Sequence, residues 1–262
     1  MIFSSVWLDR KRGMSLKRSR FSQILAGVLV NAIYEMKNYP IVTLSAVISP
    51  LSLLAVVAFV SNGDLLGTAI AGGLIMLFFS SGIALQSDLS HLKNDFKLQD
   101  MLVSSPASAK MYLAGMSIAE LVYSIPGIAI LIALAAIYIQ PSMLQIAIFG
   151  SVLFLMFTLS TAIGFMLATF SSDVVQSYAF SRLLSLLFAT LPPVYYPITL
   201  VPYPFNYLAY LSPTTYAAEI MHWSIGALEL SVTHLFIDWV VLIGACIIIM
   251  FVAIKKSRWR DV

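Results

Sequence analysis

Charged residues are scarce in this chain. Only 10% of its 262 residues are charged, 15 of them Lys or Arg and 12 Asp or Glu, whereas about 25% is typical of a soluble domain. Four stretches carry no charge at all: residues 38–63, 65–87, 121–172 and 183–218. Such stretches cannot provide a water-facing surface, so the composition excludes an ordinary soluble enzyme and predicts an integral membrane protein.

Cysteine and histidine are also rare. Cys246 is the single cysteine, which excludes an internal disulfide and a metal site built from cysteines alone. The three histidines, His91, His222 and His234, have spacings that suit no common zinc motif. We therefore expect no metal site.

Motifs for nucleotide binding and hydrolytic chemistry are missing. The sequence contains no G-x-x-x-x-G-K-[ST], G-x-G-x-x-G, H-E-x-x-H or G-x-S-x-G, so we expect the chain itself to bind no cofactor and to hydrolyse no ATP. A membrane-embedded enzyme stays an alternative, but it would need clustered polar residues where the spans offer an isolated Glu120. A stand-alone channel or secondary transporter is a second alternative, although no inverted pair of obviously broken spans is apparent.

Long apolar runs are what the sequence does contain. A helix needs about 20 apolar residues to cross the hydrocarbon core and satisfies its own backbone hydrogen bonds there. The runs predict an all-α membrane protein with six transmembrane helices, and Pro126 predicts a tilt or kink in the long third one. The predicted spans are residues 41–60, 66–85, 111–139, 145–170, 182 to the Pro192-Pro193 pair, and 235–254.

The basic residues fall on one side of these spans. Seven precede the first span, three lie between the second and third, one (Arg182) lies between the fourth and fifth, and four follow the sixth. The remaining loops hold no Lys or Arg. Because basic residues collect on the cytoplasmic side, both termini are predicted to be cytoplasmic in a multi-pass protein of the cell membrane.

The first 40 residues are predicted to form a cytoplasmic tail and an interfacial helix. From Phe21 to Met36 the apolar positions follow helical spacing, as in an amphipathic helix lying on the membrane surface. A signal peptide is the alternative. The organisation is then this leading segment, a membrane domain over 41–254 and a basic tail over 255–262.

Charged residues inside the membrane domain gather in the cytoplasmic loop 86–110. Leucines and a phenylalanine recur there at approximately helical spacing among acidic and basic residues, which predicts a short amphipathic helix that could dock into another protein. The alternative is a solvated connector with a helical turn.

The segment 191–226 is rich in proline and tyrosine. It holds six of the eleven prolines and six of the twelve tyrosines. Proline interrupts a regular helix, yet the segment is almost uncharged, so we expect broken helices that re-enter the outer leaflet. The alternative is that its aromatic residues sit at the interface and bind nothing.

Two motifs resemble those of the permease subunits of ABC-2 type ABC transporters, which include daunorubicin-resistance and polysaccharide-export permeases. Residues 192–226, PPVYYPITLVPYPFNYLAYLSPTTYAAEIMHWSIG, are similar to the family pattern P-x-x-[FY]-P…L-P…L-[NS]-P-x-T-[YH]-x-x-E. The loop segment LQDMLVSSPAS resembles T-L-E-x-L-L-x-S-P-V-S, with Asp100 at the usual Glu and Gln99 at the usual Leu.

The resemblance implies an exporter subunit that pairs with a second copy or a homologous permease and contacts a separate ATPase subunit, which would hold ATP and magnesium. We expect no nucleic acid among the partners of the chain. The loop would couple the two proteins through Leu92, Asp95, Phe96, Leu98, Asp100, Met101, Leu102 and Pro106.

Residues of the translocation path are predicted from two features. Glu120 and Asp238 are acids in apolar surroundings, where a lone charge is costly and points to a function, although either could simply be a buried or solvated polar contact. The outer segment supplies the other candidates. The predicted path comprises Glu120, Tyr195, Tyr196, Pro197, Pro213, Tyr216, Glu219 and Asp238. Amphiphilic drugs, lipids and lipid-linked glycans all fit as cargo.

Overall fold

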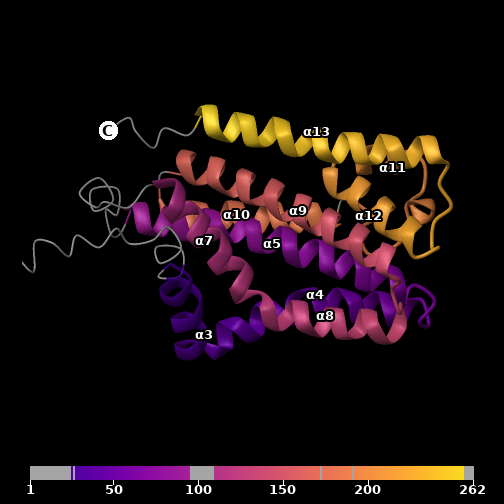
Figure 1. Ribbon diagram of the computed structural model, residues 1–262, viewed down its shortest axis with the longest axis horizontal. Helices are drawn as coiled ribbons and strands as arrows, with labels where there is room; N and C mark the ends of the chain where they lie inside the picture. The colour runs from indigo at the N-terminus through magenta and orange to yellow at the C-terminus, as the bar shows by residue number, and fades with distance from the viewer. Residues whose placement is uncertain (1–24, 26, 95–108, 172, 191, 257–262) are drawn as a thin grey trace, which may run out of the picture.

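The computed structural model describes residues 25, 27–94, 109–171, 173–190 and 192–256, and these residues form helices and connecting turns without strands (Figure 1). In chain order the elements are η1 (Leu29–Ile33), α3 (Tyr34–Asn38), α4 (Pro40–Val60), α5 (Leu66–Asn94), α7 (Ala109–Tyr123), α8 (Ile125–Tyr138), α9 (Met143–Phe170), α10 (Val174–Thr190), η2 (Ile198–Leu200), α11 (Phe205–Ala209), α12 (Pro213–Ser224) and α13 (Val232–Lys256).

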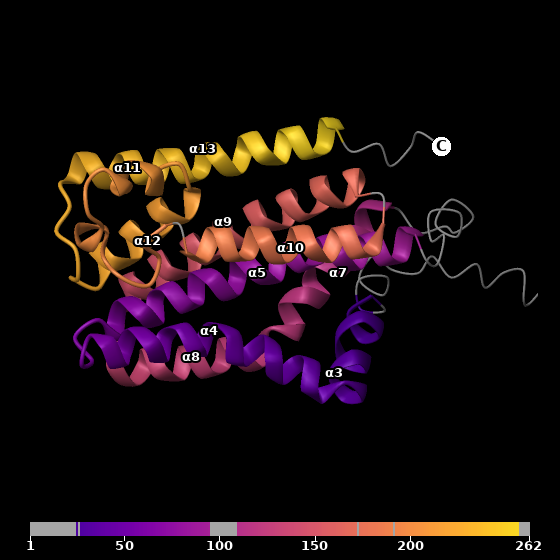
Figure 2. The same cartoon turned by 180° about the vertical axis from the view of Figure 1, so that it is seen from behind.

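Several helices meet the requirements for crossing a membrane. Within the described residues, α5, α9 and α13 are long and apolar enough, and the bent pair α7–α8 makes a fourth candidate if it counts as one span. These helices run alongside one another over the length of the molecule (Figures 1 and 2). The protein is therefore built as a multi-pass helical membrane protein.

The predicted kink in the third span is confirmed. Helices α7 and α8 meet at Ser124 with a bend of 55°. Pro126 occupies the first turn of α8, where its missing N–H and its ring prevent α7 from continuing straight. The Ser124 hydroxyl donates to the Glu120 carbonyl at 3.1 Å, which satisfies one acceptor at the end of α7.

Two helix boundaries differ from the sequence prediction. The fifth long helix, α10, begins at Val174 and not near Arg182, because the Asp173 carboxylate accepts from the Gln176 N–H at 3.0 Å and caps the helix start. Helix α5 continues to Asn94 instead of ending near residue 85. Its last turns stay helical because Leu85 and Leu89 are buried against Met116 of α7 and Ala168 of α9.

The core of the bundle lies between α5 and α9. Side chains such as Phe79, Ile83, Met156 and Leu159 are buried in it. Close approach of the two backbones is permitted by glycine: a Cβ on Gly82 would lie 2.8 Å from the Thr161 nitrogen, and one on Gly164 would lie 2.8 Å from the Gly82 carbonyl oxygen. Small residues at a membrane-helix interface allow this kind of dense apolar packing.

The described part of the amino-terminal segment runs across the end of the bundle, at an angle to α4 (Figures 1 and 2). Val28 and Ala32 are buried against Ala119 of α7. Helix α3 ends at Asn38, and Tyr39 has φ −126° and ψ 62° before Pro40 opens α4. The change of direction follows from proline, which disfavours helical backbone at the preceding residue.

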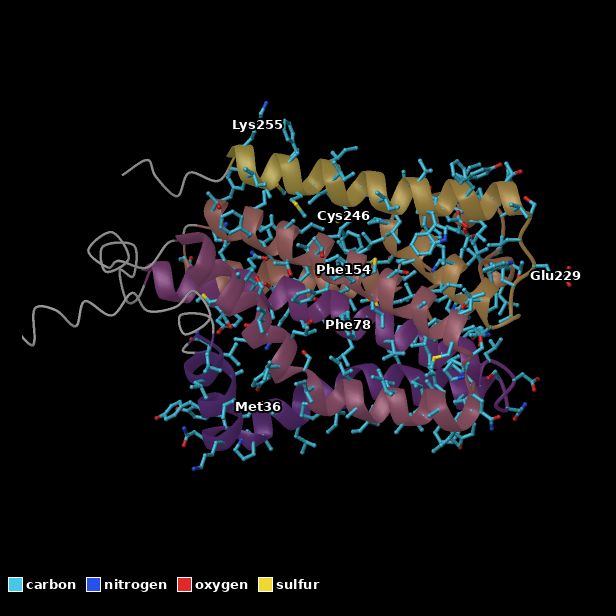
Figure 3. The ribbon with its side chains drawn as sticks, in the orientation of Figure 1. Met36, Phe78, Phe154, Glu229, Cys246 and Lys255 are labelled. Carbon is cyan, nitrogen blue, oxygen red and sulfur yellow. The ribbon has the colours of Figure 1, made fainter. Side chains whose placement is uncertain are left out.

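The two ends of the bundle differ in charge. Met36 and Lys255 lie at the same end of the bundle, on opposite sides of it, while Glu229 lies at the opposite end (Figure 3). Helices α11 and α12 lie toward that opposite end, beside the beginning of α13 (Figure 1). The segment after α10 thus forms η2, α11 and α12, short helical pieces.

Candidate functional site

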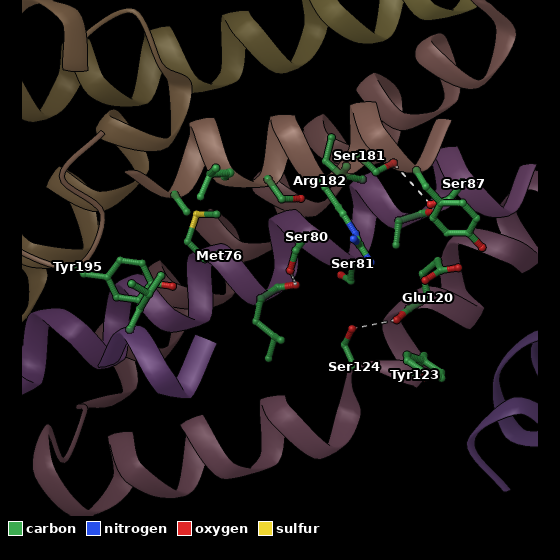
Figure 4. A pocket seen from close by; sticks show the side chains of 18 residues that line it. Met76, Ser80, Ser81, Ser87, Glu120, Tyr123, Ser124, Ser181, Arg182 and Tyr195 are labelled. Carbon is green, nitrogen blue, oxygen red and sulfur yellow. Dashed lines mark hydrogen bonds between the residues drawn. The ribbon is translucent and has the colours of Figure 1, made fainter. Parts of the chain in front are cut away.

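A cavity of about 580 Å³ lies among α4, α5, the α7–α8 bend and α10 (Figure 4). Serines contribute much of its polar wall: Ser80, Ser81, Ser87, Ser124, Ser181 and Ser185. The rest of the wall is mostly aliphatic and aromatic. A cavity of this size is within the range of small-molecule sites, and it lies within the depth of the candidate spans.

Glu120 is one of two predicted path residues that line the cavity, and Tyr195 is the other. The Glu120 side chain is 8% exposed and lies beside Ser124, at the bend of the third span (Figure 4). Tyr195 comes from the segment that follows α10 and lies at the far end of the cavity (Figure 4). The structure therefore brings together two residues that are 75 positions apart in the numbering.

Arg182 also lines the cavity, which the sequence analysis missed. It was assigned to the cytoplasmic loop because a charge is costly in the hydrocarbon region, but it occupies the middle of α10, eight residues from either end. A signal was present, since Tyr178, Ser181 and Ser185 recur on the same face of that helix as Arg182.

A second polar group links α5 to α10 beside the cavity. Gln86 is fully buried; its amide donates to the Ser171 hydroxyl at 3.4 Å and accepts from the Ser181 hydroxyl at 3.1 Å. The Ser177 hydroxyl donates to the Gln86 backbone carbonyl at 3.1 Å. Because Ser181 also lines the cavity, this hydrogen-bonded cluster joins the cavity wall to the carboxyl-terminal half of α5.

A cluster of acids and tyrosines lies near the beginning of α13. The Tyr210 hydroxyl donates to Glu219 Oε1 at 2.9 Å, and the carboxyls of Glu219 and Asp238 are in hydrogen-bonding contact. Burial and the adjacent charge of Asp238 raise the pKa of Glu219 to about 7. Tyr216 and His234 are the other titratable groups that influence this cluster.

The segment after α10 is attached to α5 by close backbone contact. A Cβ on Gly72 would lie 2.7 Å from the Val194 carbonyl carbon, so only glycine permits this approach. The Thr68 hydroxyl donates to the Tyr195 carbonyl at 3.2 Å. His222 of α12 is in hydrogen-bonding contact with the backbone of Thr68 and Val194, and burial lowers its pKa to about 4, which keeps it neutral.

Comparison with protein families shows to which family this chain belongs. The model of the family described as ABC-2 type transporter matches residues 7–225. The chain belongs to the ABC-2 type transporter family. Comparison with curated proteins gives no match. As a member of this family the chain is the membrane domain of an ABC transporter, and the family implies a lipid bilayer around it and an ABC ATPase as its partner.

The predicted path residues of this ABC-2 permease fall into two places. Glu120 and Tyr195 line the cavity, while Glu219 and Asp238 meet in the acid cluster with Tyr216 nearby. The remaining three belong to neither place. Tyr196 packs against the core, Pro197 directly precedes η2, and Pro213 is the first residue of α12, whose N-cap is Ser212. The eight residues thus do not form a single site.

Most of the predicted coupling residues lie outside the described residues of the ABC-2 permease: Asp95, Phe96, Leu98, Asp100, Met101, Leu102 and Pro106. Leu92 is in the last turns of α5. Helix α5 therefore leads directly from the cavity wall to the predicted coupling segment.

Proposed function

We propose that this ABC-2 permease forms the translocation path of an exporter together with a second copy or a homologous permease, and that a separate ATPase drives it. The single observation that carries this proposal is the serine-lined cavity with its two charged residues, Glu120 and Arg182. Charged residues placed in a cavity within the depth of apolar spans are costly unless polar solute or water uses that cavity.

The proposed arrangement has six spans with both termini in the cytoplasm. Helix α4, the α7–α8 pair and α10 would join α5, α9 and α13 as spans. The charge difference between the ends of the bundle supports this orientation, with Lys255 at one end and Glu229 at the other. The segment 191–226 would re-enter the outer leaflet, and residues 1–40 and 255–262 would stay on the cytoplasmic side.

A second permease would close the open side of the cavity. On that side, Leu53 of α4 lines the cavity and is 37% exposed. Tyr178 and Leu186, which line the cavity, are exposed as well. A partner helix packed on this face would convert the cavity into a path shared by two subunits.

Coupling to the ATPase would run through the loop 86–110. The hydrogen-bonded cluster around Gln86 supports this route, because it connects α10 to the part of α5 that leads into the loop. Movement of the loop by the ATPase would then shift α10 relative to α5. ATP and magnesium would be bound by the ATPase alone.

The proposal is tested by purifying the tagged chain from its own cells. We expect an ATP-binding protein to co-purify and vanadate-sensitive ATP hydrolysis to appear in the eluate. Replacing Phe96 and Leu98 together by Asp should abolish coupling between hydrolysis and transport, because two charges would oppose apolar docking. Ser231→Asp adds charge at the opposite end, where its side chain accepts from the His234 N–H, and serves as the control.

Two results would contradict the proposal. Solute transport by the purified chain without ATP would favour a stand-alone channel or secondary transporter. Unchanged coupling in the double aspartate variant would remove the loop from the mechanism.

A further inference from the structure

The cavity is polar at one end and apolar at the other. Ser87, Ser181, Glu120 and Arg182 lie together at one end, and Met76 and Tyr195 lie at the other (Figure 4). Because α5 runs from the Glu229 end of the bundle to the Lys255 end, the polar part of the cavity is nearer the basic end (Figures 1 and 3). A lipid-like molecule in the leaflet nearer the basic end has the same arrangement. Its polar head faces the basic end and its apolar part points toward the middle of the membrane.

The two charges in the cavity are not equally available to a ligand. Glu120 is buried and already has an interaction within the protein. Arg182 is exposed, and among the described residues its guanidinium has neither a hydrogen bond nor an ion pair. The charge that the cavity presents is therefore positive.

The position of Arg182 makes an unpaired guanidinium costly. It lies eight residues from either end of the 17-residue helix α10, so about 12 Å of helix separates it from each end. Arginine at membrane depth is normally paired or placed in a wet cavity. Its planar guanidinium binds phosphate and carboxylate through two parallel hydrogen bonds.

The serine hydroxyls beside it are oriented by their own helices. Ser81 donates to the Phe78 carbonyl at 3.0 Å and Ser87 to the Ala84 carbonyl at 3.0 Å. A hydroxyl that donates to its own helix keeps lone pairs for accepting. These serines therefore suit hydroxyl or N–H groups next to the acid that Arg182 would bind.

We propose that the cavity binds an acidic amphiphile, with its phosphate or carboxylate on the Arg182 guanidinium, its hydroxyl or N–H groups on the serines, and its apolar part toward Met76 and Tyr195. This inference rests on the proposed function, since it names the class of cargo that the path accepts. Apolar cargo and cationic drugs are thereby disfavoured, because neither would compensate the guanidinium.

The experiment measures binding to the purified chain without its ATPase, so that it is independent of the coupling test. The probe is a short-chain phosphatidylglycerol with a fluorescent label, titrated in neutral detergent and followed by anisotropy. Labelled phosphatidylcholine is the comparison. We expect at least fivefold tighter binding of phosphatidylglycerol.

Substitutions then assign the selectivity to Arg182. Arg182→Gln should weaken phosphatidylglycerol binding about tenfold, the usual effect of losing a charge-assisted hydrogen bond, and should change phosphatidylcholine binding less than twofold. Arg182→Lys should retain most of the preference. Lys255→Gln removes the same charge at the end of α13, where Lys255 lies over the Phe251 ring, and should change nothing.

Glu120→Gln provides a test in the opposite direction. Removing the nearby negative charge should leave binding of the acidic probe unchanged or tighten it by a few fold. Weaker binding of the acidic probe in this variant, with no effect of Arg182→Gln, would overturn the proposal, because Glu120 and not Arg182 would then hold the probe.

Two further results would also overturn it. Equal competition by soluble glycerol 3-phosphate would show that the site binds an acid group without its apolar part. A change in oligomeric state of Arg182→Gln, with unchanged lipid selectivity, would show that Arg182 pairs with a second subunit. If ATPase co-purification fails while the charge selectivity holds, the proposed function falls and the acidic-amphiphile site stands.

Discussion

Helix α5 meets its two long neighbours through different kinds of contact. Toward α9 the interface is dense and largely apolar, with Gly82 and Gly164 bringing the backbones together. Toward α10 the contact is mixed: the rings of Phe79 and Phe188 pack at 4.8 Å, and hydroxyl and amide groups meet around Gln86. One helix thus carries a tightly packed side and a side that is partly hydrogen-bonded.

This difference indicates which pair of helices can move. Separating α5 from α9 would open voids next to glycine, and the loss of dispersion contacts would oppose this motion. Separating α5 from α10 would break the Phe79–Phe188 contact, but the remaining links around Gln86 are hydrogen bonds, which water in the cavity can replace at small cost. We infer that α5 and α9 stay together during transport and that α10 shifts.

The largest expected effect comes from crowding the α5–α9 interface. In Gly82→Leu the new side chain would collide with Ser160 and with the Thr161 backbone, and we expect a loss of about 3 kcal/mol or failure to fold. Gly150→Leu is the control, since nothing lies within 4 Å of a Cβ there. Thermal unfolding in detergent measures both, and equal stability of the two variants would contradict the rigid interface.

A smaller effect is expected at the α5–α10 contact. Gln86→Leu removes the amide that pairs with Ser171 and Ser181, and we expect it to cost about 1–3 kcal/mol. Hydrogen exchange should rise in α10 and stay unchanged in the body of α9, before its C-cap Ser171. The exposed Gln140, in the turn before α9, offers Gln140→Leu as a control, which makes the same side-chain change away from this contact and should change stability by less than about 0.5 kcal/mol. Faster exchange in α9 would refute the distinction between the two interfaces.

The smallest effect is expected from pH at a third contact, between α12 and α13. The pKa of Glu219 is raised from 4.5 to about 7, so the folded protein holds this proton more tightly than the unfolded chain does. The resulting stabilisation is complete below about pH 4.5 and disappears as pH rises to about 7. Thermal unfolding across this range measures the slope.

Two variants isolate that proton. Glu219→Gln should reduce the pH dependence between pH 4.5 and 7 without abolishing it, because the amide does not titrate whereas the adjacent Asp238 still does. Glu229→Gln, in the exposed turn before α13, should preserve it. The same slope in both variants would assign the pH dependence to other groups.

The sequence predicted the helical class, the family and the kink at Pro126, each from a local pattern. Prediction of the site was less complete. Glu120 was found because an acid in an apolar run is conspicuous, whereas Arg182 was assigned to a loop by the same reasoning about the cost of charge. The rule that a charge inside the hydrocarbon region costs free energy singled out both residues. It could not tell whether a cavity in the folded protein would make such a charge tolerable.

Gln86 and Gly82 show a second limit. Neither is unusual in the sequence, since a glutamine at the end of an apolar run reads as a helix end and a glycine inside a helix is common in membranes. Their roles depend on Ser181 and Ser160, which come from other helices. Contacts between residues of different helices leave no periodic pattern in the sequence, so the sequence alone does not reveal them.

The sequence by itself determined that this protein works in a membrane and that it is built from helices. The free energy of transferring charged and apolar groups into hydrocarbon depends on each segment alone. Only the tertiary structure decided which polar residues share a cavity and which helices are packed tightly. Those properties depend on contacts between segments far apart in the chain. Arg182 shows the difference. The free-energy cost of placing its charge in the membrane depends on α10 alone, but its proposed role in binding a ligand depends on the serines of α5 across the cavity.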